Sequence, residues 1–275
     1  MDAKKEKLIQ ELRAVFRSCP GGTVGAEAAL PGCEGLVLFD EPLFGISDAA
    51  DPLYLKFKEK EVIGDNFMLP SEWLPEARSV IALFLPFSEA VKRSNRGDPE
   101  TTSPEWLHGR IEGQAFVNEL TRRFLAFFER RGIKACVPSL DPRFAVRTTV
   151  LPADDPKGLH IASNWSERHI AYASGLGTFC LTRGLISAKG VAGRYASIIV
   201  SEAYEADERP YTGVYDWCIM CGACISRCPA GAISLDGGKN QAKCKEWMDL
   251  MKIRYSPRYG CGKCQVGVPC ESRIP

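Results

Sequence analysis

Cys218-Ile-Met-Cys221-Gly-Ala-Cys224-Ile-Ser-Arg-Cys228-Pro229 is the stretch that decides how the C-terminal part of this 275-residue chain folds. Its spacing is C-x2-C-x2-C-x3-C-P. Two-residue gaps let three thiolates converge from one tight loop onto three irons of a 4Fe–4S cubane. The fourth thiolate lies three residues further on, and it points away toward a second cluster. The stretch therefore predicts an iron–sulfur module.

Two clusters need four more cysteines downstream, because one such run leaves each cluster short of ligands. The chain supplies Cys244, Cys261, Cys264 and Cys270. By the logic of bacterial two-cluster ferredoxins, Cys270 completes the cluster of Cys218, Cys221 and Cys224, and Cys228 joins the other three. Zinc is the alternative, since it could use two C-x2-C pairs, but the additional cysteine and the terminal Cys-Pro favour iron.

The overall composition is that of an ordinary globular protein, with 35 Lys and Arg against 34 Asp and Glu. Without a basic excess, nucleic acid is an unlikely partner. No apolar stretch reaches the length of a membrane span, and the charged N-terminus has no signal-peptide core. We therefore expect a cytoplasmic protein without a membrane partner, in which twelve cysteines serve metal or redox chemistry rather than disulfides.

The uneven distribution of cysteines sets the expected domain division, with residues 1–212 upstream and residues 213–275 forming the cluster module. Four scattered upstream cysteines are interpreted as small buried apolar residues: Cys19, Cys33, Cys136 and Cys180. Apolar periodicity and turn residues predict a mixed α/β upstream part. The expected helices cover residues 8–16, 103–132 and 164–174, and the expected strands cover residues 36–39, 79–85, 133–137 and 195–201.

Three upstream stretches resemble a known family. They are Leu74–Ile81 (LPEARSVI), Glu167–Gly177 (ERHIAYASGLG), and Gly184–Ser187 followed by Arg194–Ser201. Their order is similar to that of the corrinoid-dependent epoxyqueuosine reductases and, more distantly, of the corrinoid reductive dehalogenases. The isolated Cys244 and the later C-x2-C pair also fall where that family places the ligands of its second cluster. The resemblance spans roughly residues 70–275.

This resemblance implies an α+β protein, in which a nitroreductase-like α/β domain binds cobalamin beside a C-terminal two-cluster ferredoxin-like module. The implied cofactor-binding residues are Gly175, Leu176, Gly177, Thr178, Ile186, Ser187, Ala196 and Ser197. Glycines at such a turn let a backbone lie against a flat cofactor, and a plain helix C-cap is the alternative. FMN is the alternative cofactor, because other nitroreductase-like domains hold a flavin.

The sequence departs from the family pattern in three places. Ile161 stands where the family has an Asp that looks like the proton donor for epoxide reduction, which puts epoxyqueuosine in doubt as the substrate. Cys264 and Cys270 are separated by five residues rather than three, and Pro269 precedes the cysteine instead of following it. The helical-repeat extension that grips transfer RNA in many members is also missing from this sequence.

The replacement acid is sought among His169, Glu167 and His160. His169 is the best placed, because it lies on the helix that leads into Gly175 and titrates near neutral pH. Packing inside the helix is the alternative for this histidine. Glu167 and Arg168 together can equally form a structural ion pair, and Trp165 is expected in the core rather than against a substrate.

The sequence thus predicts a cytoplasmic, cobalamin-dependent reductase of a small organic substrate. Electrons from an external low-potential donor, such as ferredoxin or flavodoxin, would pass through two 4Fe–4S clusters to cobalt. Two alternatives remain open. One is an electron-transfer or reductive-activator protein that serves a partner corrinoid enzyme, and the other is a flavin-containing reductase.

Overall fold

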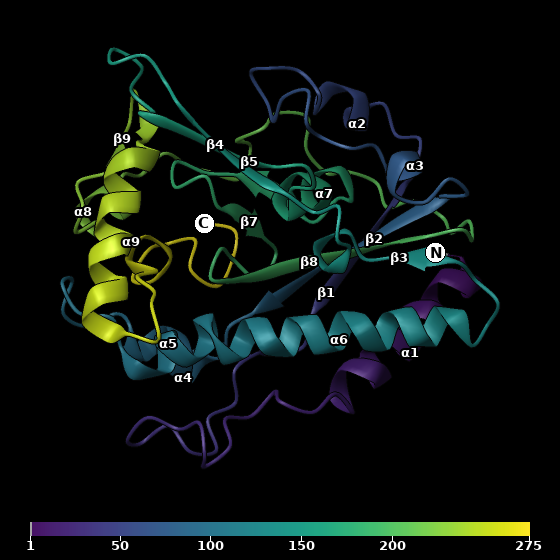
Figure 1. The fold of residues 1–275 in the computed structure, drawn as a ribbon, viewed down its shortest axis with the longest axis horizontal. Helices are drawn as coiled ribbons and strands as arrows, with labels where there is room; N and C mark the ends of the chain where they lie inside the picture. The colour runs from purple at the N-terminus through teal and green to yellow at the C-terminus, as the bar shows by residue number, and fades with distance from the viewer. Residues whose placement is uncertain (1) are drawn as a thin grey trace.

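A four-stranded antiparallel sheet lies at the centre of the computed structural model, which describes residues 2–275 (Figure 1). Its strand order is β1 (Leu43–Asp48), β2 (Ser79–Pro86), β8 (Gly193–Val200) and β3 (Ala135–Cys136). Within the sheet Ile81 of β2 pairs with Ile46 of β1 and with Ile198 of β8. All eight residues of β2 are buried, because helices cover both faces of this strand.

The two faces of the sheet carry separate hydrophobic clusters, since successive side chains of a strand point to opposite sides. Ile81 and Leu83 pack against α1 (Ala3–Arg17) and α6 (Glu112–Glu129). Val80 and Ala82 face α7 (Glu167–Ala173) and the aromatic residues around it. The short helices α2 (Leu53–Lys56) and α3 (Pro70–Trp73) lie on this second side, opposite α6 (Figure 1).

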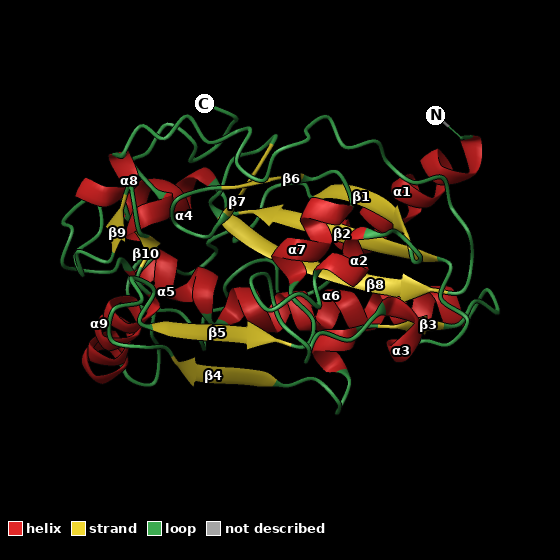
Figure 2. Ribbon diagram, turned by 90° about the horizontal axis from the view of Figure 1, so that it is seen from above, coloured by secondary structure: helices red, strands yellow, loops and turns green. Residues whose placement is uncertain are grey.

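The other elements gather mainly at one end of the sheet. Three two-stranded hairpins pair β4 (Val146–Val150) with β5 (Leu159–Ser163), β6 (Gly177–Phe179) with β7 (Leu185–Ser187), and β9 (Ile233–Ser234) with β10 (Gly238–Lys239). The remaining helices are α4 (Glu89–Ser94), α5 (Pro104–Arg110), α8 (Ala223–Ser226) and α9 (Gln241–Tyr255), with 3-10 turns at Pro138–Leu140 and Lys263–Gln265. Figure 2 shows α8, α9 and the β9–β10 hairpin at the same end of the molecule as α4 and α5.

The predicted α+β class is confirmed, with corrections to single elements. The strands expected at residues 79–85 and 195–201 are β2 and β8. The helix expected over residues 103–132 is two helices, because the chain bends at Ile111 between α5 and α6. Residues 36–39 make only isolated bridges to Thr23 and Phe87, and β1 forms the edge of the sheet instead. In the described range 2–275, no helix is long and apolar enough to cross a membrane.

Candidate functional site

Four cysteines meet at the loop that leads into α8, and we call Cys218, Cys221, Cys224 and Cys270 the first cysteine group. The Cys224 thiol lies within electrostatic range of Cys218 and Cys221. The Cys270 thiol lies near Cys218 and Cys224, although it is far away in sequence. Cys221 is exposed, whereas burial raises the pKa of Cys270 to about 12. A thiol of this kind becomes a thiolate only when a metal replaces its proton.

The second cysteine group consists of Cys228, Cys244, Cys261 and Cys264. The thiols of Cys261 and Cys264 each have Cys244 and Cys228 as charged neighbours. The cysteines that the spacing assigns to each cluster thus lie near one another, and their role as cluster ligands stays a prediction. No three His, Cys, Asp or Glu side chains in residues 2–275 converge closely enough for a single metal ion. The preference for iron over zinc therefore rests on the spacing of the cysteines in the sequence and not on this geometry.

Close backbone contacts hold the loop of the second group. Gly262, between Cys261 and Cys264, has φ +66° and lies directly against the indole of Trp106 on α5. A Cβ at this glycine would lie 1.9 Å from Cζ2 of Trp106. The Asn95 side chain donates a hydrogen bond to the carbonyl of Cys261 at 2.8 Å, and the Ala232 amide donates to Cys228 Sγ at 3.3 Å.

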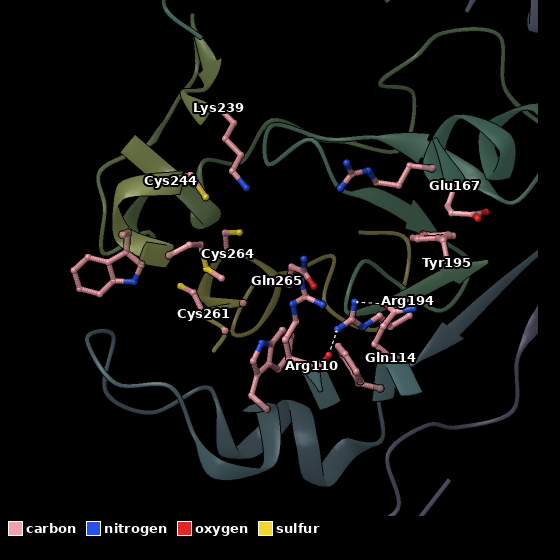
Figure 3. A pocket seen from close by; sticks show the side chains of 18 of the residues that line it. Arg110, Gln114, Glu167, Arg194, Tyr195, Lys239, Cys244, Cys261, Cys264 and Gln265 are labelled. Atoms are coloured by element: carbon pink, nitrogen blue, oxygen red, sulfur yellow. Dashed lines mark hydrogen bonds between the residues drawn. The ribbon is translucent and has the colours of Figure 1, made fainter. Parts of the chain in front are cut away.

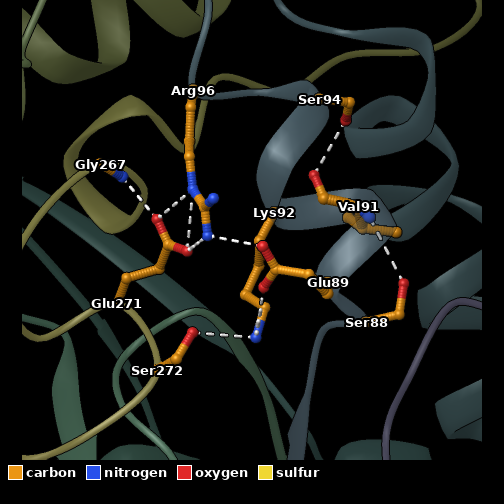
Figure 4. Close-up of polar contacts among 9 residues, drawn as sticks. All are labelled: Ser88, Glu89, Val91, Lys92, Ser94, Arg96, Gly267, Glu271 and Ser272. Atoms are coloured by element: carbon orange, nitrogen blue, oxygen red, sulfur yellow. Dashed lines mark hydrogen bonds and ion pairs between the residues drawn. The ribbon is translucent and has the colours of Figure 1, made fainter.

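The chain around Cys270 returns to the start of β8. The Val191 amide donates to the Cys270 carbonyl at 2.9 Å. The next residue, Glu271, is 6% exposed and accepts hydrogen bonds from Arg96 and from the Gly267 amide (Figure 4). Cys180, which the sequence suggested is an ordinary buried residue, is indeed buried, and it packs beside Cys218 and Cys270.

A cavity of about 580 Å³ lies between the second cysteine group and the edge of the sheet (Figure 3). All four cysteines of that group line it. Its other charged side chains are Arg110, Glu167, Arg168, Arg194 and Lys239. The aromatic part of its wall is formed by Phe87, Trp106, Phe144, Trp165, Tyr195 and Trp247. This size and this mixture of apolar and a few polar groups are typical of a ligand site.

Glu167 places a buried carboxyl group in the wall of this cavity, at the N-terminal end of α7. Its Oε2 accepts a hydrogen bond of 2.6 Å from the Ser197 hydroxyl, whereas its Oε1 is buried without a partner. Burial raises the pKa of Glu167 to about 8. Glu167 therefore holds a proton at neutral pH. The ion pair with Arg168 that the sequence offered as an alternative does not form within residues 2–275.

The structure argues against the two histidine candidates. His169 packs between Phe57 and Phe179 outside the cavity, and its Nδ1 is hydrogen bonded to the Ser166 hydroxyl at 2.8 Å. Burial, followed by the charge of Arg168, lowers its pKa to about 3. It is therefore neutral and a poor proton donor near pH 7. The Nε2 of His160 contacts the carbonyl of Ile63 at 3.1 Å, also outside the cavity.

The eight residues expected to bind a cofactor lie elsewhere. None of them lines the cavity, and all except the half-buried Gly175 are buried. Gly177 pairs with Ser187 in the β6–β7 hairpin, where a Cβ would lie 1.9 Å from the carbonyl oxygen of Ile186. Ser197 is hydrogen bonded to Trp165 and Glu167. These positions support the wall of the site from behind rather than form its surface.

Sequence reasoning missed the cationic side of the cavity. Arg110 ends α5, Arg194 and Tyr195 begin β8, and Lys239 ends β10. These positions are far apart in sequence and share no motif. Arg194 had one signal, since an arginine at the start of a strand rich in Ile and Val is unusual. Trp165 was correctly expected in the core, being 1% exposed, although one side of it also contributes to the wall.

Comparison with known proteins supports an iron–sulfur protein related to a reductase. The model of the 4Fe-4S binding domain matches residues 211–234. Epoxyqueuosine reductase of Staphylococcus aureus is 29% identical over 216 residues, which cover 73% of this chain and 50% of the relative. The chain thus spans about half the length of this curated relative.

Solved structures share the fold at low sequence identity. The catabolic reductive dehalogenase NpRdhA, in complex with 3-bromo-4-hydroxybenzoic acid, matches with a TM-score of 0.56 and 16% identity, over 98% of this chain and 36% of that one. An epoxyqueuosine reductase with a modified tRNA stem loop matches with a TM-score of 0.51 and 18% identity, over 97% of this chain and 65% of that one. Because that structure contains RNA, the expectation that excludes nucleic acid as a partner is unsupported.

The fold and the cysteine motif define the class, an α+β iron–sulfur protein related to oxidoreductases. Within this class the chain is related to epoxyqueuosine reductase, and it shares its fold with the reductive dehalogenases.

Proposed function

We propose that this protein is a cytoplasmic iron–sulfur reductase that acts on a small organic substrate in the cavity beside the second cysteine group. One observation carries the proposal. The same cavity is lined by the four cysteines suited to hold a cluster and by a protonated carboxyl group, Glu167, with a free Oε1. A reductase needs a source of electrons and a source of protons at one place, and this cavity combines both.

The two cysteine groups differ in solvent exposure, and this difference suggests the order in which electrons pass through them. Cys221 of the first group is exposed, and apolar side chains around it face solvent: Val214, Tyr215, Ile219 and Met220. An exposed apolar patch suits transient docking of a partner such as ferredoxin or flavodoxin. Electrons would therefore enter at the first cluster and leave from the second cluster into the cavity.

Glu167 would supply the proton. Its carboxyl group is neutral at pH 7 because burial disfavours the charged form. After the proton leaves, the hydrogen bond from Ser197 stabilises the carboxylate until it is protonated again. This residue replaces the Asp that the family pattern has at position 161, since Ile161 is exposed on β5 and lies outside the cavity. A raised pKa of this kind is a common device of general acids.

The wall of the cavity also offers polar contacts to a resident cofactor. Buried atoms without partners at its wall, Glu167 Oε1 and Arg194 Nε, fit a ligand with many polar groups, as cobalamin has. Gln114, Gln265 and Tyr195 would add polar contacts at the same wall (Figure 3). Cobalamin, when bound, would accept electrons from the clusters and reduce the substrate, and FMN is the alternative.

The test begins with anaerobically reconstituted protein, in which iron, cobalt and flavin are measured together with the visible spectrum. We expect about eight irons per chain, as two four-iron clusters require, and binding of added cobalamin. Glu167→Gln should keep the clusters and the bound cofactor but lose most of the turnover, because the amide has no acidic proton. Wild-type turnover should decline as pH rises through about 8, where Glu167 ionises. Full activity of Glu167→Gln would contradict its assignment as the acid.

Ligand assignment has its own test. Cys270→Ala should damage the cluster of the first group, and Cys228→Ala the cluster of the second, in paramagnetic resonance spectra of the two variants. Loss of the same signal in both would disprove the division into two groups. If the wild type holds two clusters but neither cobalamin nor FMN, an electron-transfer or activator protein becomes the better explanation.

A further inference from the structure

Four cationic side chains line the cavity, and none of them has an acidic partner in residues 2–275. They are Arg110, Arg168, Arg194 and Lys239, and no salt bridge of the described chain includes them. The one carboxyl group at the wall, Glu167, is neutral at pH 7. The cavity is therefore strongly positive. Arg110, Arg194 and Lys239 are half-buried, whereas Arg168 is exposed. A half-buried charge loses part of its hydration, and a ligand of opposite charge would offset that loss.

A cluster on the second cysteine group accounts for only part of this charge. Lys239 lies close to Cys244 and Cys264, and it is also within electrostatic range of Arg168. The negative charge of a thiolate-bound cluster would fall on this pair. Arg110 on α5 and Arg194 on β8 would remain without a negative charge to balance them (Figure 3).

Arg110 and Arg194 repel each other and are held together by neutral groups alone. Arg194 donates to Gln114 Oε1 at 3.1 Å and to the Arg110 carbonyl at 2.7 Å, while Arg110 donates to the Tyr259 hydroxyl at 2.7 Å. Burial, followed by the charge of Arg110, lowers the pKa of Arg194 to about 9. Arg194 Nε is buried without an acceptor. The neighbouring residues therefore fix two guanidinium groups in place and leave their charge unbalanced.

We propose that the Arg110–Arg194 pair binds an oxyanion, a carboxylate or phosphate group, of the small molecule that fills the cavity. Guanidinium groups hold carboxylate and phosphate through charge-assisted, frequently bidentate hydrogen bonds. The inference rests on the proposed function in that it assigns the substrate of that reductase to the class of organic anions. The same chemistry could come from the phosphate of a bound cofactor, and the test below separates the two sources.

The test measures binding by calorimetry to anaerobically reconstituted protein, with benzoate, its uncharged counterpart benzamide, and inorganic phosphate as probes. We expect benzoate to bind at least about 10-fold more tightly than benzamide, as a charge-assisted contact requires. Arg194→Gln should weaken benzoate binding by about 10- to 100-fold and remove the preference over benzamide. Arg194→Lys, which keeps the charge, should restore part of the preference. The control Arg147→Gln changes an exposed arginine on β4 and should bind as the wild type does.

Loading with cobalamin or FMN identifies the source of the anion. If benzoate still binds to the loaded protein, the pair serves the substrate. If the cofactor displaces benzoate and phosphate from wild type but shows no such competition in Arg194→Gln, the pair serves the cofactor phosphate. Equal affinities for benzoate and benzamide, or unchanged binding by Arg194→Gln, would overturn the inference. Since no turnover is needed, a protein that binds benzoate but takes up neither cobalamin nor FMN would refute the reductase and leave the anion site standing.

Discussion

Arg96 binds the carboxylate of Glu271, the residue that follows Cys270 of the first cysteine group. Its Nε lies 3.1 Å from both carboxylate oxygens, and its Nη2 also contacts Glu89 of α4 at 2.8 Å (Figure 4). Glu271 is buried, so this bond fixes the backbone next to Cys270 rather than a mobile surface side chain. Through Glu89 and Arg96, α4 is thus connected to the residue next to Cys270, the proposed fourth ligand of the first cluster.

Removal of the Arg96–Glu271 interaction should lead to loss of the cluster of the first cysteine group. Arg96→Met leaves the Glu271 carboxylate buried without its main partner, a loss of about 1–3 kcal/mol in the free energy of unfolding. We expect iron to fall from about eight to about four per chain, with the signal of the second cluster retained. Arg17→Met is the control, because its ion pair with Glu41 is exposed and should contribute little. Eight irons in Arg96→Met would show that Cys270 is positioned without this interaction.

The second cluster should depend on Gly262 in the same way. A methyl group there must displace the Trp106 ring, which closes the loop between Cys261 and Cys264. We expect Gly262→Ala to lose the second cluster and keep the first, as judged by iron content and paramagnetic resonance. Gly21→Ala is the matched control, since Gly21 also has positive φ but open space around it. Both changes carry the backbone strain of about 1–2 kcal/mol, so a difference between them reports the contact with Trp106.

Gly177 tests whether the β6–β7 hairpin supports the site through stability alone. A Cβ would meet the Ile186 carbonyl at 1.9 Å, so Gly177→Ala should lower the free energy of unfolding by about 1–3 kcal/mol, as overpacking does. Gly25→Ala, with nothing within 4 Å, should change it little. Denaturant titration of the two variants is the measurement. If Gly177 binds the cofactor, as the resemblance implies, a substitution here would instead abolish cobalamin binding and spare the clusters. Intact stability combined with lost cobalamin binding would favour that view.

Glu167 should make the protein less stable as pH rises. Its pKa increases from 4.5 in the unfolded chain to about 8 in the folded protein, so the folded state binds more protons between these values. Its contribution to stability is therefore complete below about 4.5 and is lost as pH approaches 8. Glu167→Gln lacks this dependence. The difference in free energy of unfolding between wild type and variant should fall across this window, and a flat difference would place the carboxyl group in water.

The division of eight cysteines into two groups could be predicted because it follows from local spacing and from counting thiolates, and their role as cluster ligands stays a prediction. Cys228 and Cys270 could be assigned to opposite groups without any knowledge of the fold. The strand β2 was equally accessible, since an apolar run ended by Pro86 has few other interpretations. Its neighbours in the sheet were not, because pairing of β1, β2 and β8 depends on contacts between residues far apart in sequence.

The choice of a proton donor shows that the usual pKa of a residue type can mislead. His169 has a suitable pKa in water, and sequence reasoning ranked it first for that reason. In the folded protein burial makes His169 too weak a base to hold a proton and makes Glu167 hold one at neutral pH. The burial of each side chain decides between Glu167 and His169 as the acid. That burial depends on how α7 packs against the sheet, which the sequence does not show. The anion-binding pair, Arg110 and Arg194, was hidden for the same reason.

The crossing of Cys228 and Cys270 between the two groups has a consequence for biosynthesis. During translation the first three cysteines emerge long before Cys270, and the second group also waits for Cys261 and Cys264. If each group holds a cubane as proposed, neither cubane obtains its fourth thiolate until Cys261, Cys264 and Cys270 have been synthesised. A nascent chain thus exposes incomplete sets of thiols together, and iron delivered too early would meet only open, oxygen-sensitive sites. Cluster insertion is therefore expected to follow synthesis rather than accompany it.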